Sequence, residues 1–522
     1  MAYELKELIV VLGLSILLFA VARSTALVFM DAADFKLRRN VWLTLTVVAF
    51  LSPSFWLFVA VAAPLTYWAG KKDRNPTALF LMLMSVIPPI SVSIPPILIQ
   101  EIFSLDIFRL LALCVLVPAA LRLRRSAAAG QIRGLKLMDV ALLGFGVMTV
   151  VLYVPPDFGN GRILQDSVTN DVRSAFLYLI DVYALYYVAS RTCTDQKKLR
   201  EAMAAFCLAC AVMALVAVFE GAKHWLLYTE INSRWGGNSV LDFYYMRGDS
   251  LRAQASTGEP LSLAFMLVFA LGFWFYLQSL VKNTRAKVGM TVLLCAGVLA
   301  TFSRGAWMAA VLVYFAYAAF DPRGRIFRSL AVFALIGAVV LASPLGDKIS
   351  GVIPFLGGTV DTDTLNYRER LLDRSWELIK AKPILGDQLA LTKMEDLRQG
   401  QGIIDVVNAY VGVTLFYGFA GLGLFMTFIL VPLGRALVKS RRVFKVDPDS
   451  GLLGASLAAA IVASLLMLAD SSLGTGPAHI FYILMGLAGA YAAVISPRKS
   501  VTAAQHSDSQ ATIDASLGNQ AH

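Results

Sequence analysis

The sequence contains few charged residues. Asp, Glu, Lys and Arg make up only 16% of its 522 residues, whereas apolar residues make up 58%. Ordinary soluble domains carry about 25% charged residues, and a soluble fold of this length needs that charge to cover its surface. This composition excludes a typical cytosolic enzyme, and the high apolar content excludes a disordered chain. A polytopic membrane protein remains.

Other scarce features exclude further classes. The chain has four histidines and five cysteines, and their positions show neither a disulfide framework nor metal-ligand spacing. A G-x-S-x-G elbow and a P-loop are both absent. Asp361-Thr362-Asp363 is a D-x-D motif, but no nucleotide-binding domain accompanies it, so we interpret it as a solvated loop. We therefore expect no metal and no cofactor.

Long apolar runs are abundant and predict an all-α, polytopic transmembrane helical bundle of about 12–15 membrane helices, from 8–30 to 477–494. The first run follows Glu4, Lys6 and Glu7, which favours an uncleaved membrane helix over a signal peptide. Pro53 divides the run at 41–70, which predicts two short helices there. Two Ile-Pro-Pro-Ile motifs predict that the run at 77–99 is discontinuous.

The net charge of +11 comes mainly from basic clusters in short loops between the apolar runs. From residue 71 onward, two spans fit between successive clusters, so all these loops can be cytoplasmic together. This explanation makes a nucleic-acid partner unnecessary. The longer loops, at 155–173, 221–256 and 345–407, then lie on the outer face.

The largest outer loop, 345–407, contains a helical pattern. Asn366 and Glu369 form a capping box, and we expect an amphipathic helix over 367–381 at the outer membrane–water boundary. Its apolar stripe consists of Leu371, Leu372, Trp376, Leu378 and Ile379. The chain thus divides into N-terminal transmembrane helices (1–170), a second transmembrane region that includes this loop (171–495), and a disordered cytoplasmic tail (496–522).

Arg304 lies in a turn between two apolar runs, on the predicted outer side. An arginine at membrane depth costs about 2.5–3.5 kcal/mol on insertion scales. Either it snorkels to the surface or it forms an anion site, because a guanidinium binds phosphate bidentately and stays charged. We favour the anion site.

Arg252 precedes another span, and Glu259 stands at the start of that helix. A carboxylate suits a helix N-terminus, so Glu259 is either a cap or a reactive carboxylate. Asp181 falls inside a span without an obvious partner. It is expected to hydrogen-bond another helix or to face a wet cavity.

Arg368 and Arg370 open the predicted loop helix, where the helix dipole disfavours cations. They are either surface charges, with Arg370–Asp373 and Arg374–Glu377 as ion pairs, or phosphate ligands. After the loop, Asp405 and Asn408 precede the next span, and they either cap that helix or contribute to a site.

Three of these stretches together resemble the O-antigen ligase and O-antigen polymerase superfamily of bacterial membrane glycosyltransferases. The resemblance covers about residues 170–490, and the stretch Arg252–Pro260 resembles the basic stretch before the family's middle span. The three motifs are Ser303-Arg304-Gly305-Ala306-Trp307; Tyr367-Arg368 with Trp376, Pro383 and Gly386; and Asn408 with Tyr410, Gly418 and Gly421.

The resemblance implies a donor glycan linked to polyprenyl diphosphate, bound from the outer face of the bacterial inner membrane. An acceptor hydroxyl attacks the anomeric carbon, and the diphosphate leaves without help from a metal. Arg304 and Arg368 would bind the diphosphate, and Arg252 would bind the diphosphate or the glycan. Asp405 or Glu259 would be the base. Glycan contact or structural support would come from Asn408, Tyr410, Trp376 and Arg370.

One departure decides between branches of the family. Ligases carry a histidine before the asparagine, and this chain has Val407 at that position. We therefore predict a polymerase of an exopolysaccharide or O-antigen, with membrane lipids, a chain-length regulator and export proteins as partners. The alternatives are a ligase that transfers glycan to a lipid core or protein, and a polysaccharide transporter or flippase.

Overall fold

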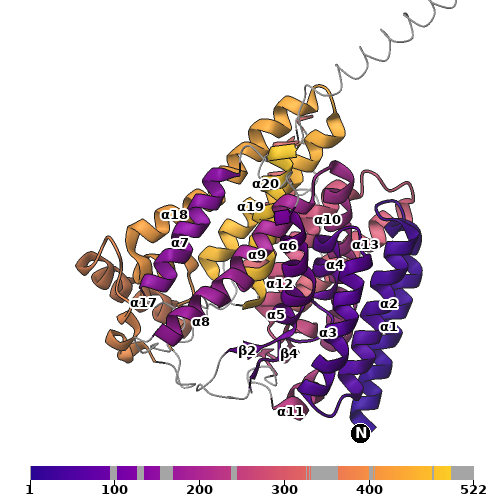
Figure 1. Cartoon of the computed structure of the whole chain (residues 1–522), viewed down its shortest axis with the longest axis horizontal. Coiled ribbons are helices and arrows are strands. Elements are labelled where there is room, and N and C mark those ends of the chain that lie inside the picture. Colours follow the sequence, from indigo (N-terminus) through magenta and orange to yellow (C-terminus); the bar gives the residue numbers. More distant parts are fainter. Residues whose placement is uncertain are drawn as a thin grey trace, which may run out of the picture.

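The structure is a computed structural model (Figure 1), and it describes residues 2–94, 103–125, 135–152, 168–236, 244–321, 323–324, 326–327, 330, 362–398, 404, 406–472 and 475–494. Most of the described chain is helical. Its strands form two short antiparallel ribbons, β1 (Val92–Ser93) with β2 (Ser104–Leu105) and β3 (Met246–Arg247) with β4 (Ser250–Leu251). The predicted all-α polytopic bundle is confirmed.

The helices of the first half are α1 (Ala2–Ala26), α2 (Ala32–Leu51), α3 (Phe55–Lys72), α4 (Pro76–Leu83), α5 (Ile107–Leu111), α6 (Val117–Arg125), α7 (Lys136–Val151), α8 (Val168–Tyr178), α9 (Ala184–Thr192), α10 (Gln196–Lys223) and α11 (Thr229–Trp235). The second half holds α12 (Pro260–Leu277), α13 (Thr284–Ala300), α14 (Arg304–Phe320), α17 (Thr362–Ala381), α18 (Ala409–Phe444), α19 (Pro448–Asp470) and α20 (Thr475–Val494).

Six of the described helical segments are long and apolar enough to cross a membrane. Other expected spans coincide with shorter helices, such as α7 with 16 residues and α13 with 17 residues. The six are Glu4–Ala26, Val172–Thr192, Gln196–Lys223, Pro260–Leu277, Ala409–Phe444 and Pro448–Asp470.

The two predicted helix breaks are present. The run at 41–70 divides at Pro53 into α2 and α3, and the Ser54 hydroxyl caps α3 by accepting a hydrogen bond from the Leu57 amide. In the proline-rich run, α4 ends at Leu83 and the chain is non-helical through the first Ile-Pro-Pro-Ile motif. Most of the second motif lies outside the described residues.

The connections gather at two ends of the bundle. At one, which we call the basic end, the turns at 27–31, 73–75 and 193–195 meet, and Asp31 pairs with both Arg74 and Lys197. At the other, which we call the hairpin end, lie the β3–β4 ribbon, α11 and the N-terminus of α1 (Figure 1).

Just inside the basic end, a fully buried arginine joins three segments. Arg38 of α2 donates to the Asp73 carboxylate after α3 and to the Glu201 carboxylate of α10, each at 2.7 Å. Removing one partner of such a buried group costs about 3–5 kcal/mol. This cluster therefore fixes how α2 and the end of α3 sit against α10.

The centre of the bundle consists of α10 and α12, the most buried of the six spans. On one side of this centre, α14 and α18 both pack against α19 (Figure 1). These three helices end or begin at the hairpin end, where their termini and the long loop helix meet.

The predicted amphipathic loop helix is confirmed as α17, with two corrections. It begins at Thr362, so Asn366 lies inside the helix and the predicted capping box is wrong. Leu371 and Ile379 are buried, whereas Leu372 and Trp376 are half exposed, so the predicted stripe splits into a packed and an open strip.

The predicted domain boundaries remain predictions. The predicted disordered tail and the entry of the large loop lie outside the described residues.

Candidate active site

The turn that carries Arg304 is held in an unfavourable backbone conformation. Between α13 and α14, Phe302 adopts a positive φ of 46°, which costs a residue with a side chain about 1–3 kcal/mol. Arg304 follows two positions later as the first residue of α14, and its side chain is partly buried. Such strain persists only where surrounding groups hold the turn.

Two arginines supply that support. Arg252 donates its Nε hydrogen to the Thr301 carbonyl at 3.1 Å, and Arg247 of β3 donates an Nη1 hydrogen to the Phe302 carbonyl at 2.6 Å. The backbone adds a bond from the Ala253 amide to the Ala300 carbonyl at 2.9 Å. The β3–β4 ribbon therefore packs over the turn and brings Arg247, which the sequence analysis did not select, beside Arg252.

The charges at this turn are positive and close to one another. Burial lowers the pKa of Arg252, and repulsion by Arg247 lowers it further. Both guanidinium groups stay protonated, because an arginine pKa lies far above neutrality. An anion bound here would relieve the repulsion, which is the behaviour expected of a phosphate-binding surface.

A fully buried glutamate fixes the segment that carries Arg252. The Glu220 carboxylate of α10 accepts hydrogen bonds from the backbone amides of Leu227, Gln254 and Ala255, at 3.1, 3.0 and 2.8 Å. Ala255 has a positive φ of 46°. Glu220 therefore holds a strained turn three residues after Arg252. Its sequence context, at the end of an apolar helix, does not reveal this role.

Glu259 stands at the N-cap position of α12 and is exposed. Its carboxylate accepts a hydrogen bond from Ser262 at 3.0 Å but none from a backbone amide of the helix end. It lies close enough to Arg252 to interact with it electrostatically. The structure thus brings Glu259 and Arg252 together.

Arg368 points from α17 toward the end of α19. Its Nη1 atom lies 2.5 Å from Oδ1 of Asp470, and both side chains are partly exposed. An exposed ion pair of this kind contributes only about 0–1 kcal/mol to stability. Asp470 is the main site residue that the sequence analysis missed, because its sequence context is the polar end of an apolar helix.

Asp470 also contacts the Arg304 turn. A Cβ atom added to Gly305 would overlap the Asp470 carboxylate, so a larger residue there would displace the Asp470 side chain or α14. The glycine of the Ser-Arg-Gly-Ala motif therefore allows a close approach of Asp470 to the start of α14. Through this contact, Asp470 joins the N-terminus of α14 to Arg368 of α17.

The position of α17 depends on two glycines that face each other. Gly386, with φ 71°, and Gly418, with φ 64°, each leave no room for a Cβ atom against the other segment's backbone. The Asp387 amide bonds the Leu415 carbonyl at 2.8 Å, and the Phe419 amide bonds the Pro383 carbonyl at 2.8 Å. The turn after α17 thus inserts at the Gly418 kink of α18, which explains why these motif residues occur together.

A buried carboxylate strengthens the same turn. Asp387 accepts hydrogen bonds from Lys382, at 3.1 Å, and from Lys393. Burial raises the pKa of Asp387, but the bonds from Lys393 and Lys382 outweigh burial and hold this pKa below its ordinary value. This pair of bonds ties the short 3-10 turn at Ala390–Lys393 to the end of α17.

The start of α18 is fixed by Asn408, one of the two residues predicted to cap it. The Asn408 side chain accepts hydrogen bonds from the amides of Tyr410 and Val411, at 3.0 and 3.1 Å. The Tyr410 hydroxyl donates to the Leu465 carbonyl of α19 at 2.8 Å, and the Ala409 amide bonds the Ser471 carbonyl. Asn408 therefore caps α18, as one of its two interpretations predicted, and Tyr410 joins α18 to α19; their role in a site remains a prediction. Asp405, the other predicted base, lies outside the described residues.

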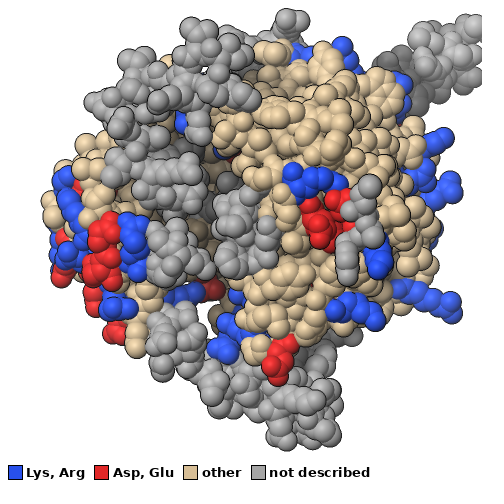
Figure 2. All heavy atoms as spheres, turned by 90° about the horizontal axis from the view of Figure 1, so that it is seen from below, with Lys and Arg blue, Asp and Glu red and all other residues tan. Residues whose placement is uncertain are grey.

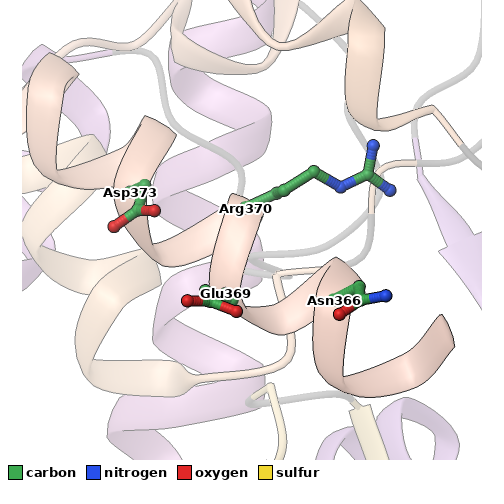
Figure 3. Close-up of a pocket in the computed structure, with 4 residues that line it drawn as sticks. All are labelled: Asn366, Glu369, Arg370 and Asp373. Carbon is green, nitrogen blue, oxygen red and sulfur yellow. The ribbon is translucent and has the colours of Figure 1, made fainter. Parts of the chain in front are cut away.

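The other face of α17 lines a pocket of about 500 Å³, formed by Asn366, Glu369, Arg370 and Asp373 (Figure 3). The Arg370 side chain extends away from Asp373 (Figure 3). The predicted Arg370–Asp373 pair is absent among the described ion pairs, whereas the Arg374–Glu377 pair is present at 2.7 Å. The four residues all come from α17, so this hollow is an open, polar face of the helix.

Trp376 continues this face toward the C-terminus of α17. Its side chain is 49% exposed, and the Lys380 ammonium lies 5.4 Å from its ring centroid. Seen from the hairpin end, acidic and basic side chains gather at the edge where α17 and the following turns lie (Figure 2). The open face of α17 is therefore polar and aromatic, whereas Arg368 lies on the side toward α19.

Asp181 has a partner on another helix, as one of its two interpretations predicted. Its carboxylate pairs with Arg109 of α5 at 2.8 Å, and Arg109 also donates to the Ser104 carbonyl at 2.6 Å. Asp181 lies within a π-helical turn, Leu179–Tyr183. Within the described residues, no cluster of three or more His, Cys, Asp or Glu side chains could hold a metal ion.

Part of the candidate site lies in a segment of the sequence that matches a known family. A comparison with curated proteins returns no match. Residues 289–426 match the family model described as O-Antigen ligase. This segment contains the Arg304 turn, α17, the Gly386–Gly418 contact and the start of α18, whereas Arg252, Glu259 and Asp470 lie outside it.

The family's members are glycosyl-transferring enzymes that act on lipid-linked glycans in membranes. Together with the apolar helices, the match identifies a multi-pass membrane protein. It supports placing this chain in the O-antigen ligase and O-antigen polymerase superfamily, as the three motifs predicted.

Proposed function

We propose that this protein polymerises oligosaccharide units linked to polyprenyl diphosphate into an exopolysaccharide or O-antigen, on the outer face of the bacterial inner membrane. The observation that carries the proposal is the convergence of Arg368, Asp470 and Gly305 at the hairpin end. A cationic surface at the end of a transmembrane bundle suits a substrate whose diphosphate joins a lipid to a sugar.

The chemistry needs stabilisation of the charge that develops on the leaving diphosphate. Arginines held in place before the reaction supply it, because fixed charges need no reorganisation in the transition state. Arg304 and Arg368 would bind the diphosphate. Arg252, whose neighbour Arg247 makes the surface more positive, would bind the diphosphate or the first sugar. This assignment uses no metal and no cofactor.

A general base must come within hydrogen-bond reach of the acceptor hydroxyl. Glu259 is exposed beside Arg252, and Asp405 precedes the capped start of α18. These are the two bases that the sequence alone predicts. The polar face of α17 with Arg370, and Trp376 beyond it, would contact the sugars, since sugar hydroxyls need paired donors and acceptors.

The choice of polymerase over ligase rests on Val407, which stands where ligases carry a histidine. Its position directly before the Asn408 cap leaves no imidazole there to activate an acceptor. The family description, O-Antigen ligase, supports the second candidate, transfer of glycan to a lipid core or to protein.

The deciding experiment is transfer by the purified protein in detergent, with its native polyprenyl-diphosphate oligosaccharide. Products are separated by gel for the wild type, Arg304→Ala and the control Arg374→Ala, whose arginine pairs with Glu377. A ladder from the wild type and the control, lost in Arg304→Ala, is the expected result. A single addition to a lipid core would identify a ligase.

Cells distinguish a polymerase from a flippase. If the protein is a polymerase, Arg304→Ala and Arg368→Ala cells accumulate single lipid-linked units on the outer face. If it is a flippase, the units stay on the inner face, where an added outer-face glycosidase cannot reach them. A chain-length regulator and export proteins are the expected partners in the cell.

A further inference from the structure

The Asp470 carboxylate occupies a position that is suited to a phosphate. It pairs with the Arg368 guanidinium at 2.5 Å and lies against Gly305, the second residue of the 17-residue helix α14. A helix N-terminus favours a negative charge, and a guanidinium favours a carboxylate or phosphate. Two independent features therefore attract an anion to one point, and in this structure a side chain of the protein is that anion.

The placement of Asp470 does not serve the helix that carries it. Asp470 is the last residue of α19, where the helix dipole disfavours an acidic group. The Asp470 side chain is 31% exposed and the Arg368 side chain 42% exposed, so a solute can reach the pair. A partly exposed pair is also weak, and a diphosphate, with more charge and more acceptor oxygens, competes well for the same arginine.

We propose that the Arg368–Asp470 pair is opened by the donor, and that the carboxylate it releases is the general base for transfer. This inference rests on the proposed function. The donor diphosphate replaces Asp470 on Arg368 and at the N-terminus of α14. The freed carboxylate then lies beside the bound diphosphate, on the side where an acceptor hydroxyl can approach the sugar.

The step balances in atoms and charge. The acceptor hydroxyl gives its proton to a carboxylate oxygen of Asp470, and its oxygen forms a bond to the anomeric carbon. The bond from that carbon to the diphosphate oxygen breaks, and the electron pair leaves with polyprenyl diphosphate. Arg368 stabilises the departing charge. Asp470 then loses its proton to water and pairs with Arg368 again when the diphosphate dissociates.

This arrangement links the base to the presence of the donor. Without donor, Asp470 is held by Arg368 and cannot accept a proton from an acceptor. With donor bound, the same carboxylate is free and adjacent to the sugar. The pair also lowers the apparent affinity for the diphosphate, because the site is available only when the pair is open.

The test combines a binding measurement with a transfer measurement on the full-length protein in detergent. The variants are Asp470→Asn, Asp470→Ala and Arg368→Gln. Asp449→Asn is the control for Asp470, because Asp449 lies at the opposite end of α19 and also pairs with an arginine, Arg200. Binding uses inorganic pyrophosphate in calorimetry, and transfer uses the lipid-linked donor.

Asp470→Asn is expected to bind pyrophosphate at least about twofold more tightly than the wild type, because the competing carboxylate is gone. Its kcat is expected to fall by about 100-fold or more, the usual contribution of a general base. Added formate should restore part of the kcat of Asp470→Ala. Arg368→Gln should lose pyrophosphate affinity, and Asp449→Asn should behave as the wild type.

Opposite results overturn the proposal. Pyrophosphate affinity that is unchanged or weaker in Asp470→Asn excludes competition. A kcat close to that of the wild type, or a loss in Asp470→Ala that formate does not restore, excludes the role as base. The pyrophosphate-binding measurement needs no turnover, so it tests competition between Asp470 and phosphate even if the wild type transfers no glycan. Absence of transfer by the wild type would instead contradict the proposed function.

Discussion

Asp470 Oδ1 lies 2.5 Å from Arg368 Nη1, although 102 positions separate the two residues in the chain. The pair links the end of α19 to the loop helix α17, and the contact of Asp470 with Gly305 adds the start of α14. Since each of these elements is anchored elsewhere in the bundle, the site geometry depends on several distant contacts.

Gly305→Ala is predicted to disrupt the site without disrupting the fold. The added methyl group overlaps the Asp470 carboxylate, so either α14 or Asp470 must move. A displacement of about 1 Å at a reacting centre can lower turnover by about 100-fold. We expect a loss of transfer of about tenfold or more in the gel assay, with little change in melting temperature.

Gly423→Ala in α18 is the matched control for Gly305→Ala, because a Cβ atom added at Gly423 meets no other group within 4 Å. This variant should keep wild-type transfer. Equal activity of the two alanine variants would contradict the importance of the Gly305–Asp470 contact.

Gly418→Ala is predicted to detach α17 from α18. The residue has a positive φ of 64°, and an added Cβ atom would overlap the Ile384 backbone. With ψ at −169°, this backbone conformation is essentially restricted to glycine and alone costs an alanine about 1–3 kcal/mol. Limited proteolysis should cut the segment after α17 faster than in the wild type. Gly434→Ala, where an added Cβ atom meets nothing within 4 Å, should be cut at the wild-type rate.

The sequence sufficed to predict the helical bundle and the Pro53 break, whereas the site residues remain a prediction. Apolar runs and motif residues such as Arg304 and Gly418 are local features, and they appear directly in the sequence. The family resemblance then predicted that Arg368 and Arg304 act together, and the structure joins their elements through Asp470.

The residues that position the site could not be predicted in the same way. Asp470, Glu220 and Arg247 each act on a segment far away in the chain, through a contact that only the packed helices create. The start of α17 was misplaced because Asn366 and Glu369 satisfy the capping-box spacing inside the helix. Local pattern therefore predicted the elements that meet at the candidate site better than it predicted the distant residues that position them.

Glu220→Gln is predicted to impair glycan transfer, because Glu220 holds the segment that positions Arg252. The Glu220 carboxylate accepts hydrogen bonds from the backbone amides of Gln254 and Ala255. Glutamine keeps one acceptor oxygen, but its NH₂ group is a donor and cannot accept from a backbone amide. An unsatisfied buried donor costs about 1–3 kcal/mol, and the turn after Arg252 should loosen. The thermal midpoint should fall, and the KM for donor should rise.

A double-mutant cycle separates this effect from general destabilisation. If Glu220 acts by positioning Arg252, Glu220→Gln should have little further effect on transfer in an Arg252→Gln background. Strictly additive effects on transfer would show that the two residues act independently.

The Asp387 contact predicts an acid-sensitive loop. Because the folded-state pKa of Asp387 lies below its ordinary value, its stabilising effect is complete above the unfolded-state pKa of about 3.9. It is lost as the pH falls through the folded-state pKa. Proteolytic cleavage near Lys393, followed with an acid protease, should therefore accelerate below about pH 4. Asp387→Asn should be cleaved faster at neutral pH and should lose this pH dependence.

Removal of divalent metal is predicted to leave transfer intact. If Arg304, Arg368 and Arg252 carry the charge of the diphosphate, they already supply the electrostatic stabilisation that a cation would otherwise give to the leaving group. Protein and donor treated with excess EDTA should therefore give the same ladder as untreated samples.

The assay should also be run with Arg368→Lys, whose ammonium keeps the charge but lacks the planar fork that binds phosphate bidentately. A fall in transfer by this variant, with no restoration by added Mg²⁺, is the expected result. Loss of the wild-type ladder in EDTA and its recovery with Mg²⁺ would assign the stabilisation of the diphosphate to a metal instead.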